Sequence, residues 1–159
     1  MIEINTTITW QRNNEKFIDG RYSRAHTWNF DGGFTVPASS SPHVVPIPYS
    51  VESAVDPEEA FVASLSSCHM LWFLSIAAKR GFVLDSYHDS AVGEMSKNED
   101  GKLFVSVVRL RPCIGWNGDA PDGSQILAMH EEAHASCFIA NSVLTTIYID
   151  PTSDRPDTD

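Results

Sequence analysis

Residues 56–81 decide the fold and read DPEEAFVASLSSCHMLWFLSIAAKRG. Asp56 is a favourable N-cap, Pro57 suits the first helical position, and the two glutamates that follow face the positive end of the helix dipole. A Lys-Arg pair then precedes Gly81, the residue type that commonly ends a helix. We therefore expect one helix of about 24 residues, roughly 36 Å long at ~1.5 Å per residue.

The centre of this helix has no polar face. Apolar side chains occupy every position over 70–74, so this part requires cover on all sides. A single small domain offers too little cover, and a partner subunit is its natural source. We expect a homodimer with the long helix buried inside it.

Short strands are predicted on the N-terminal side of the helix. Isoleucines and a tryptophan alternate with polar residues over 2–10, so the first strand should start almost at the first residue. Residues 26–30 and 34–36 flank an Asp-Gly-Gly turn, which is typical of a hairpin. Four prolines within 37–55 remove backbone donors and predict a long loop.

The C-terminal side adds a second hairpin and a shorter helix. Residues 82–95 and 103–116 flank a turn at 98–101, and the second of these segments is rich in β-branched and aromatic side chains. Ser124 is predicted to cap a helix that ends near Cys137.

A last strand is predicted over 144–149, before a proline. Together these patterns predict an α+β protein in which the long helix packs against antiparallel β-sheets. We expect one domain over 1–150 and a polar, acidic, frayed tail over 151–159.

Composition excludes several classes of partner. The chain has 159 residues, 42% of them hydrophobic, and a formal net charge of −10. Such a charge repels phosphate backbones and anionic membrane surfaces, so neither nucleic acid nor a membrane is expected as a partner. The N-terminus lacks the pattern of a secretory signal, and the longest near-apolar run, 68–78, is too short to span a bilayer.

Cysteine usage points to a reducing compartment. The three cysteines are too few, and odd in number, for a disulfide framework, and their spacings match no CxxC motif. We expect a cytoplasmic protein with reduced cysteines. The role of each thiol then depends on its own surroundings. Cys113, beside a proline in a predicted strand, is expected to be structural.

The other two cysteines lie on the two predicted helices and are the candidates for redox chemistry. Cys68 lies about three turns into the long helix, beyond the reach of the helix dipole. To act as a thiolate it needs a nearby cation, and Arg21, Arg24 and a protonated His69 are the choices. Cys137, on the second helix, can condense with a sulfenic acid on Cys68 if the helices cross. For either cysteine alone, a buried and unreactive thiol is the alternative.

Residues 130–134, His-Glu-Glu-Ala-His, match the HExxH pattern of zinc peptidases. A zinc site needs a third ligand, and only 25 residues follow His134. We expect an ordinary solvated helix face here, and neither a metal nor a cofactor. A zinc peptidase is the third-ranked alternative.

Residues 56–68, Asp-Pro-Glu-Glu-Ala-Phe-Val-Ala-Ser-Leu-Ser-Ser-Cys, resemble the OsmC/Ohr family of osmotically inducible and organic hydroperoxide resistance proteins. That family begins this helix with Asn-Pro-Glu-Glu or Asn-Pro-Glu-Gln and has a cysteine ten residues after the glutamate, which is the spacing found here. Residues 137–142 resemble its second motif, a cysteine near the end of the next major helix followed by Asn or Gln and small residues. Phe138 stands where the family commonly has proline. The order of elements is similar along nearly the whole chain.

The resemblance implies a fold and an activity. The fold is the OsmC-like intertwined α+β homodimer, with the long helices buried at its centre against antiparallel β-sheets. The activity is that of a thiol-dependent peroxidase which reduces organic hydroperoxides, and also hydrogen peroxide. An external dithiol reductant, of the lipoyl type, would restore the thiols in this stress-response, antioxidant role.

The resemblance also assigns site residues by position. The peroxidatic cysteine falls on Cys68, the resolving cysteine on Cys137 and the helix-start glutamate on Glu58. The family's arginine falls on Arg24 rather than Arg21, because its spacing to the first hairpin turn is closer. The guanidinium would stabilise the thiolate, and Glu58 would hold the guanidinium in place. Ten residues separate Glu58 from Cys68 by ~15 Å along a straight helix, so if all three groups meet, Glu58 comes from the other subunit or the helix breaks.

A second class of function fits the same fold. The chain could be a non-catalytic OsmC-like homodimer that binds a ligand, its thiols being incidental. An unreactive Cys68 would distinguish this alternative from the peroxidase.

Overall fold

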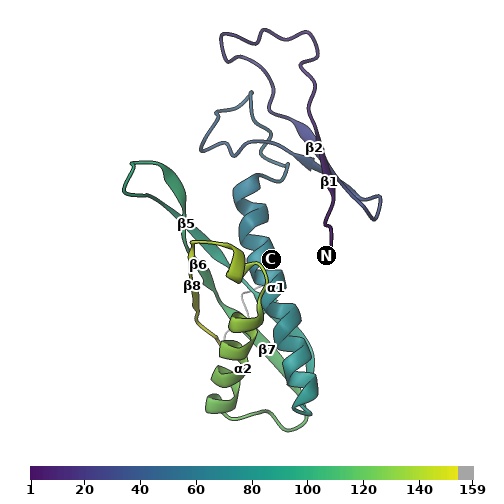
Figure 1. Cartoon of the computed structure of the whole chain (residues 1–159), viewed down its shortest axis with the longest axis vertical. Helices are drawn as coiled ribbons and strands as arrows, with labels where there is room; N and C mark the ends of the chain where they lie inside the picture. Colours follow the sequence, from purple (N-terminus) through teal and green to yellow (C-terminus); the bar gives the residue numbers. More distant parts are fainter. Residues whose placement is uncertain (154–159) are drawn as a thin grey trace. The chain divides into compact units, whose positions relative to one another are not determined.

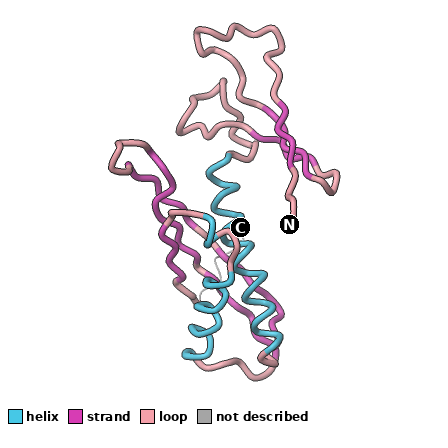
Figure 2. Tube along the Cα trace, viewed as in Figure 1, coloured by secondary structure: helices cyan, strands magenta, loops and turns pink. Residues whose placement is uncertain are grey.

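A computed structural model describes residues 1–153 of the chain. The rest of the predicted C-terminal tail, 154–159, lies outside the described residues. The chain divides into two compact units, Met1–Ala60 and a second that starts at Phe61 (Figures 1 and 2). The expectation of a single domain over 1–150 stays a prediction.

The first unit holds a three-stranded antiparallel sheet. Strands β1 (Thr6–Thr9), β2 (His26–Phe30) and β3 (Thr35–Ala38) lie in the order β1-β2-β3, which confirms the predicted hairpin. Gly33 in its turn has φ +82°, a left-handed conformation that glycine adopts without strain. The expectation that the first strand starts almost at the first residue is wrong, because β1 starts at Thr6. β2 ends opposite Thr6, so within the described residues of the chain the earlier positions have no strand to pair with.

The proline-rich segment after β3 is a loop, as predicted, apart from one bridge between Ala38 and Val55. Ser39, which is fully buried, organises this loop. Its N–H donates to the carbonyl of Val55 at 3.0 Å, and its hydroxyl accepts from the N–H of Val51 at 3.0 Å. The loop is therefore closed by its own hydrogen bonds before the long helix begins.

Helix α1 (Pro57–Lys79) confirms the prediction on which the sequence argument rests. Asp56 accepts the N–H of Glu59 at 2.8 Å, and the Glu59 carboxylate accepts the N–H of Asp56 at 3.2 Å. This reciprocal pair is a capping box. Gly81 has φ +83° directly after the last turn, as a helix stop requires.

The second unit contains the predicted second hairpin, split between two sheets. Strands β4 (Val83–Asp89) and β7 (Pro112–Asn117) pair in one sheet. Strands β5 (Val92–Lys97) and β6 (Leu103–Leu110) pair in the other, where β8 (Thr146–Ile149) lies parallel to β6.

Asp89 marks the point where the hairpin changes sheets. Its carboxylate accepts the N–H of Arg111 at 2.6 Å and the hydroxyl of Ser66 on α1 at 2.5 Å. One side chain thus ties both strand ends to the helix.

Helix α2 (Gly123–Ser136) starts at a different residue from the one predicted. Asp122, not Ser124, is its N-cap. Asp122 accepts the N–H of Gln125 at 2.9 Å, and the Gln125 side chain accepts the N–H of Asp122 at 2.9 Å. Ser124 already lies in the first turn, and its hydroxyl donates to Asp122 at 2.6 Å. A short 3-10 helix, η1 (Ala140–Ser142), follows.

The hydrophobic core of the second unit forms on both halves of α1. Along the C-terminal half, α2 lies beside α1 and both pack on β4 and β7 (Figure 1). The N-terminal half packs on β6 and β8 around Leu65, Val108 and Leu110. Leu71, in the middle of the apolar stretch, remains 61% exposed. The cover that the sequence requires at this point is not supplied by the described residues of one chain.

Candidate functional site

Two of the three cysteines meet in the second unit. Cys68 is half-buried on α1, and Cys137 is 1% exposed at the C-cap of α2. Both are free thiols, and their side chains are hydrogen-bonded to each other. The fold therefore brings together two thiols that are 69 positions apart in the sequence.

Local hydrogen bonds hold Cys137 in place. The backbone leaves the helix here, with φ −67° and ψ 114°. The side-chain amide of Asn141 donates to the carbonyls of Ala135 at 3.0 Å and Cys137 at 2.9 Å. The N–H of Ala140 donates to Cys137 Sγ at 3.3 Å. The Asn and the small residues of 137–142 thus fix the end of the helix and the sulfur together.

The two thiols differ in their surroundings. Burial, and then the hydrogen bond to Cys68, raise the pKa of Cys137 to about 11, while the Ala140 N–H acts in the opposite direction. A hydrogen bond that raises the donor's pKa favours its protonated form. Cys137 is accordingly a thiol at neutral pH.

An aromatic pair stands beside the dithiol. Trp72 is one helical turn after Cys68 and so shares its face of α1. Phe138 follows Cys137 directly and meets Trp72 edge to face, with ring centroids 5.5 Å apart. Phe138 is 70% exposed. The pair gives the neighbourhood of the sulfurs an apolar wall.

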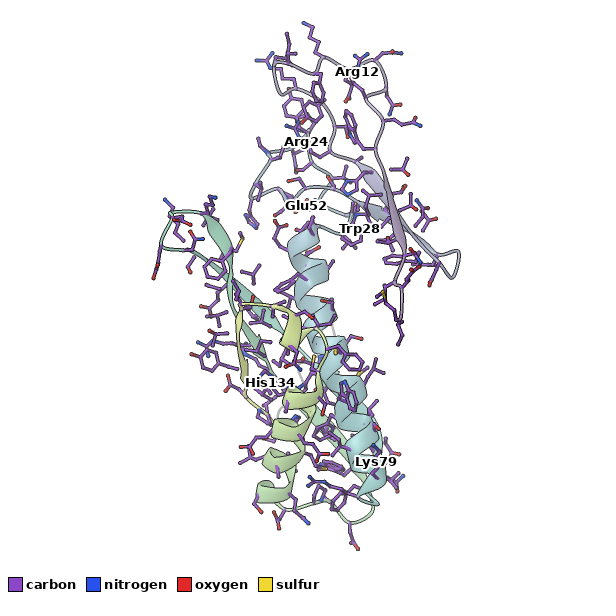
Figure 3. The ribbon with its side chains drawn as sticks, viewed as in Figure 1. Arg12, Arg24, Trp28, Glu52, Lys79 and His134 are labelled. Carbon is purple, nitrogen blue, oxygen red and sulfur yellow. The ribbon has the colours of Figure 1, made fainter. Side chains whose placement is uncertain are left out.

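The HExxH segment is only in part the solvated face that the sequence predicts, because its two glutamates are exposed whereas His130 and Ala133 are buried. His130 is 2% exposed and its Nδ1 lies 2.9 Å from Nε2 of His69, which is equally buried. Glu132 is turned away and pairs with Arg80 at 2.6 Å. His134, on the last turn of α2, is half-buried (Figure 3). Within residues 1–153 no group of three or more possible ligands is placed to hold a metal ion.

The other two predicted site residues meet in the first unit. Arg24, which is labelled in Figure 3, and Glu58 both line a cavity of about 470 Å³. Arg24 Nη1 donates to the carbonyls of Gly20, at 2.7 Å, and Tyr22. The guanidinium lies over the Tyr22 ring, 3.7 Å from its centroid. Arg24 is therefore fixed by its own loop.

Arg21, the alternative to Arg24, is exposed and does not line this cavity. The described residues show no ion pair between Arg24 and Glu58. The four predicted residues thus form two pairs, one in each unit, and their joint role stays a prediction.

Sequence reasoning missed the aromatic lining of the cavity. Trp10, Phe17 and Tyr22 contact one another, with ring centroids 4.6 to 5.9 Å apart. The Trp10 indole N–H donates to the carbonyl of Ser23 at 2.8 Å. Only the aromatic content of 10–22 signalled this cluster, because its rings come from an irregular segment without strand or helix period.

Fold and site together define an α+β protein with a dithiol between its two helices. The sequence profile of the family described as OsmC-like protein matches residues 50–152. The chain belongs to this OsmC-like family. A search of curated proteins gives no match.

Solved structures agree with this membership. An OsmC-like protein of unknown function from Vibrio cholerae is 55% identical, with a TM-score of 0.93 over 96% of this chain and 100% of that one. The OsmC-like protein of Mycoplasma pneumoniae is 15% identical, with a TM-score of 0.71 over 95% and 96% of the two chains. The organic hydroperoxide resistance protein OhrB of Bacillus subtilis is 15% identical, with a TM-score of 0.66 over 95% and 98%. The last two likenesses concern the fold alone.

Helix α1 is long and apolar enough to cross a membrane when judged by length and composition alone, unlike the shorter run considered in the sequence. The core helix of a soluble protein meets the same criteria. Because α1 carries both core clusters of an OsmC-like fold, we assign it that role in a soluble protein.

Proposed function

We propose that this protein is a cytoplasmic thiol-dependent peroxidase which reduces organic hydroperoxides, and hydrogen peroxide as a second substrate. The observation that carries the proposal is the direct contact between the Cys68 and Cys137 side chains. A sulfenic acid formed on one sulfur would have its resolving thiol already within reach. Distant relatives of the same fold are named as organic hydroperoxide resistance proteins, which supports the substrate class.

The proposed cycle has two steps and a reset. The Cys68 thiolate attacks the distal oxygen of the hydroperoxide, the O–O bond breaks, and the alcohol leaves after taking up a proton. The Cys137 sulfur then attacks the Cys68 sulfenic acid, which forms the disulfide and releases water. An external dithiol of the lipoyl type reduces the disulfide and returns both thiols.

The inequality of the thiols supports this division of roles. Cys68 is the more exposed sulfur, whereas Cys137 is buried and protonated at neutral pH. The accessible sulfur is the one that a hydroperoxide can reach, and the thiolate is the attacking species. Arg24 would stabilise that thiolate, and Glu58 would orient the guanidinium.

A homodimer is part of the proposal. Several large apolar side chains stand exposed on one chain, among them Ile8, Leu71 and Leu144. Apolar surface of this kind is expected to be covered in an assembly. An intertwined dimer would also supply Glu58 from the second subunit.

The aromatic pair supports a preference for organic substrates. Trp72 and Phe138 would contact the organic group while the peroxide reaches Cys68. We expect Phe138→Ala to raise KM for an aryl hydroperoxide about 10-fold and to leave the rate with hydrogen peroxide within about 2-fold, because a lost apolar contact is worth 1 to 3 kcal/mol. Steady-state assays with both peroxides measure the ratio. Equal effects on the two substrates would contradict the assigned preference.

The proposal is tested by mixing reduced protein with a slight excess of an alkyl hydroperoxide. Intact and peptide mass spectrometry then follow the thiols over seconds. We expect a Cys68–Cys137 disulfide in the wild type, none in Cys68→Ser, and a trapped sulfenic acid on Cys68 in Cys137→Ser. Cys113→Ser is the matched control and should behave like the wild type. Thiols that stay intact in the wild type would refute the peroxidase.

The cavity of the first unit supports a second candidate, a non-catalytic homodimer that binds a small molecule. Its aromatic rings and the fixed Arg24 suit an apolar ligand with an anionic head. The variant Cys68→Ser distinguishes the two candidate functions. A binding protein would keep its ligand affinity and have unreactive thiols in the wild type, whereas a peroxidase loses its turnover.

A further inference from the structure

The buried pair of His69 and His130 is a feature of the core that the proposed cycle does not use. The two rings are 1% and 2% exposed, and 2.9 Å separates Nε2 of His69 from Nδ1 of His130. Their planes are nearly parallel, at 9°. His130 also stacks on Phe73, with ring centroids 4.2 Å apart. The hydrogen bond therefore lies inside a packed apolar environment between α1 and α2.

Neither ring carries a charge at neutral pH. Burial first, and then the charge of His134, lower the pKa of His69 to about 4. Burial first, and then His69, lower the pKa of His130 to about 3. One neutral ring thus donates its N–H to the other. The outer nitrogens, His69 Nδ1 and His130 Nε2, have no hydrogen-bond partner within residues 1–153.

Packing alone does not account for two histidines at these positions. Two leucines would fill a similar volume and leave no buried nitrogen unpaired. The pair fixes the relative position of the two helices, because a hydrogen bond requires a defined distance and angle. Apolar contacts, in contrast, tolerate small displacements of one helix along the other. The contact therefore specifies how far α1 is advanced along α2.

The position of the pair connects it to the dithiol. His69 directly follows Cys68, and His130 precedes Cys137 by about two helical turns. Apart from the two thiols, the described residues of these helices share one other polar link, between Arg80 and Glu132, whose side chains are 37% and 51% exposed. An exposed pair of this kind contributes little to geometry. The histidine pair is the buried link close to the sulfurs.

We propose that the His69–His130 hydrogen bond is a positioning contact for disulfide formation, which holds α1 and α2 where the Cys137 sulfur can attack the oxidised Cys68. The inference rests on the proposed function. In the step concerned, the S–S bond forms, the S–O bond of the sulfenic acid breaks, and the hydroxyl leaves as water with the proton of the Cys137 thiol. Disulfide geometry accepts only a narrow range of Cα separations, so a slide of the helices would slow this step selectively.

The test separates the two chemical steps. Reduced His130→Leu protein is mixed rapidly with an alkyl hydroperoxide, and sulfenic acid is trapped with dimedone while the disulfide is counted by mass spectrometry. We expect the sulfenic acid to form within about 2-fold of the wild-type rate and the disulfide to form ~10-fold or more slowly, since a displacement near 1 Å can cost ~100-fold. His130→Gln, which can still form a hydrogen bond, should recover most of the rate. Glu132→Gln is the matched control between the same helices and should resolve like the wild type.

Stability is measured on the same proteins by urea unfolding. The double variant His69→Leu/His130→Leu should be as stable as the wild type at pH 7.5, because both partners are replaced by apolar groups, yet it should still resolve slowly. If His130→Leu does not fold, the double variant takes its place in the experiment. A double variant that forms the disulfide at the wild-type rate would overturn the positioning role, as would an unchanged rate in His130→Leu. A wild type that forms no disulfide would instead refute the peroxidase itself.

Discussion

Gly93 on β5 shows how closely α1 approaches the sheet. A Cβ at this position would lie 2.6 Å from Val62 Cγ2 and 3.5 Å from Val105 Cγ1. Because a valine on a helix strongly prefers one χ1 rotamer, this contact is costly to relieve, and Gly93→Ala should lower the free energy of unfolding by about 1 to 3 kcal/mol. Urea or guanidinium unfolding, with a common slope for variant and wild type, measures the change.

Gly123, the first residue of α2, is the matched control for this substitution. Its Cβ would meet nothing within 4 Å, and its φ lies outside the left-handed region. Gly123→Ala should therefore be neutral or stabilising by up to about 1 kcal/mol. Adding Val62→Ala to Gly93→Ala should return part of the lost stability. If both glycine variants behave alike, the close approach is not the cause.

At the scale of elements, the buried contact between α1 and α2 predicts an acid-sensitive stability. The pKa values of His69 and His130 are lowered to about 4 and 3, against 6.5 in the unfolded chain. The unfolded state therefore takes up protons below pH 6.5 while the folded state does not. The free energy of unfolding is therefore undiminished above pH 6.5 and decreases as the pH falls from there towards 4. Urea midpoints between pH 7.5 and 4.5 should decrease accordingly.

The leucine double variant provides the comparison for this pH profile. Without the two imidazoles, its urea midpoint should fall less steeply over the same range. His43, which lies in the proline-rich loop, serves as control, and His43→Leu should keep the wild-type slope. If the double variant is as acid-sensitive as the wild type, then groups other than His69 and His130 cause the loss of stability in acid.

Elements set by local sequence were predictable, and those set by distant contacts were not. Helix α1 follows its caps at Asp56 and Gly81, because capping depends on residues within one turn. The N-cap of α2 was predicted two residues too late, although Asp122 and Gln125 have the spacing of a capping box in the sequence. The parallel pairing of β8 with β6 has no local signal, since parallel partners are not joined by a turn.

The candidate site divides in the same way. Cys68 and Cys137 follow from motif spacing, and their contact agrees with the expectation that two helices cross near them. His130 was assigned to a solvated face, because a short helix with charged neighbours indicates exposure. His130 is buried because it packs against His69 on α1, and the sequence of α2 alone does not indicate this contact.

At the scale of the whole molecule, the proposed dimer predicts that a complete site uses two chains. Cys68 and Cys137 contact each other within one chain, but Glu58 lies ~15 Å from Cys68 along α1. A co-purified heterodimer of Cys68→Ser with Glu58→Gln would then hold one site with both wild-type residues and one with neither. We expect it to show about half of the wild-type peroxidase activity per dimer, well above either homodimer, because a two-fold dimer has two equivalent sites.

A second heterodimer tests the other half of this argument. Combining Cys68→Ser with Cys137→Ser leaves no chain with both thiols, and since the dithiol belongs to one chain, such a heterodimer should form no disulfide across the interface. Differently tagged subunits allow both heterodimers to be purified and assayed with the same alkyl hydroperoxide. If the first heterodimer is no more active than Glu58→Gln, Glu58 acts on its own chain's Cys68, and α1 must then bend to bring them together. If the second is active, the resolving thiol crosses between subunits, and the contact seen within one chain is not the one used in turnover.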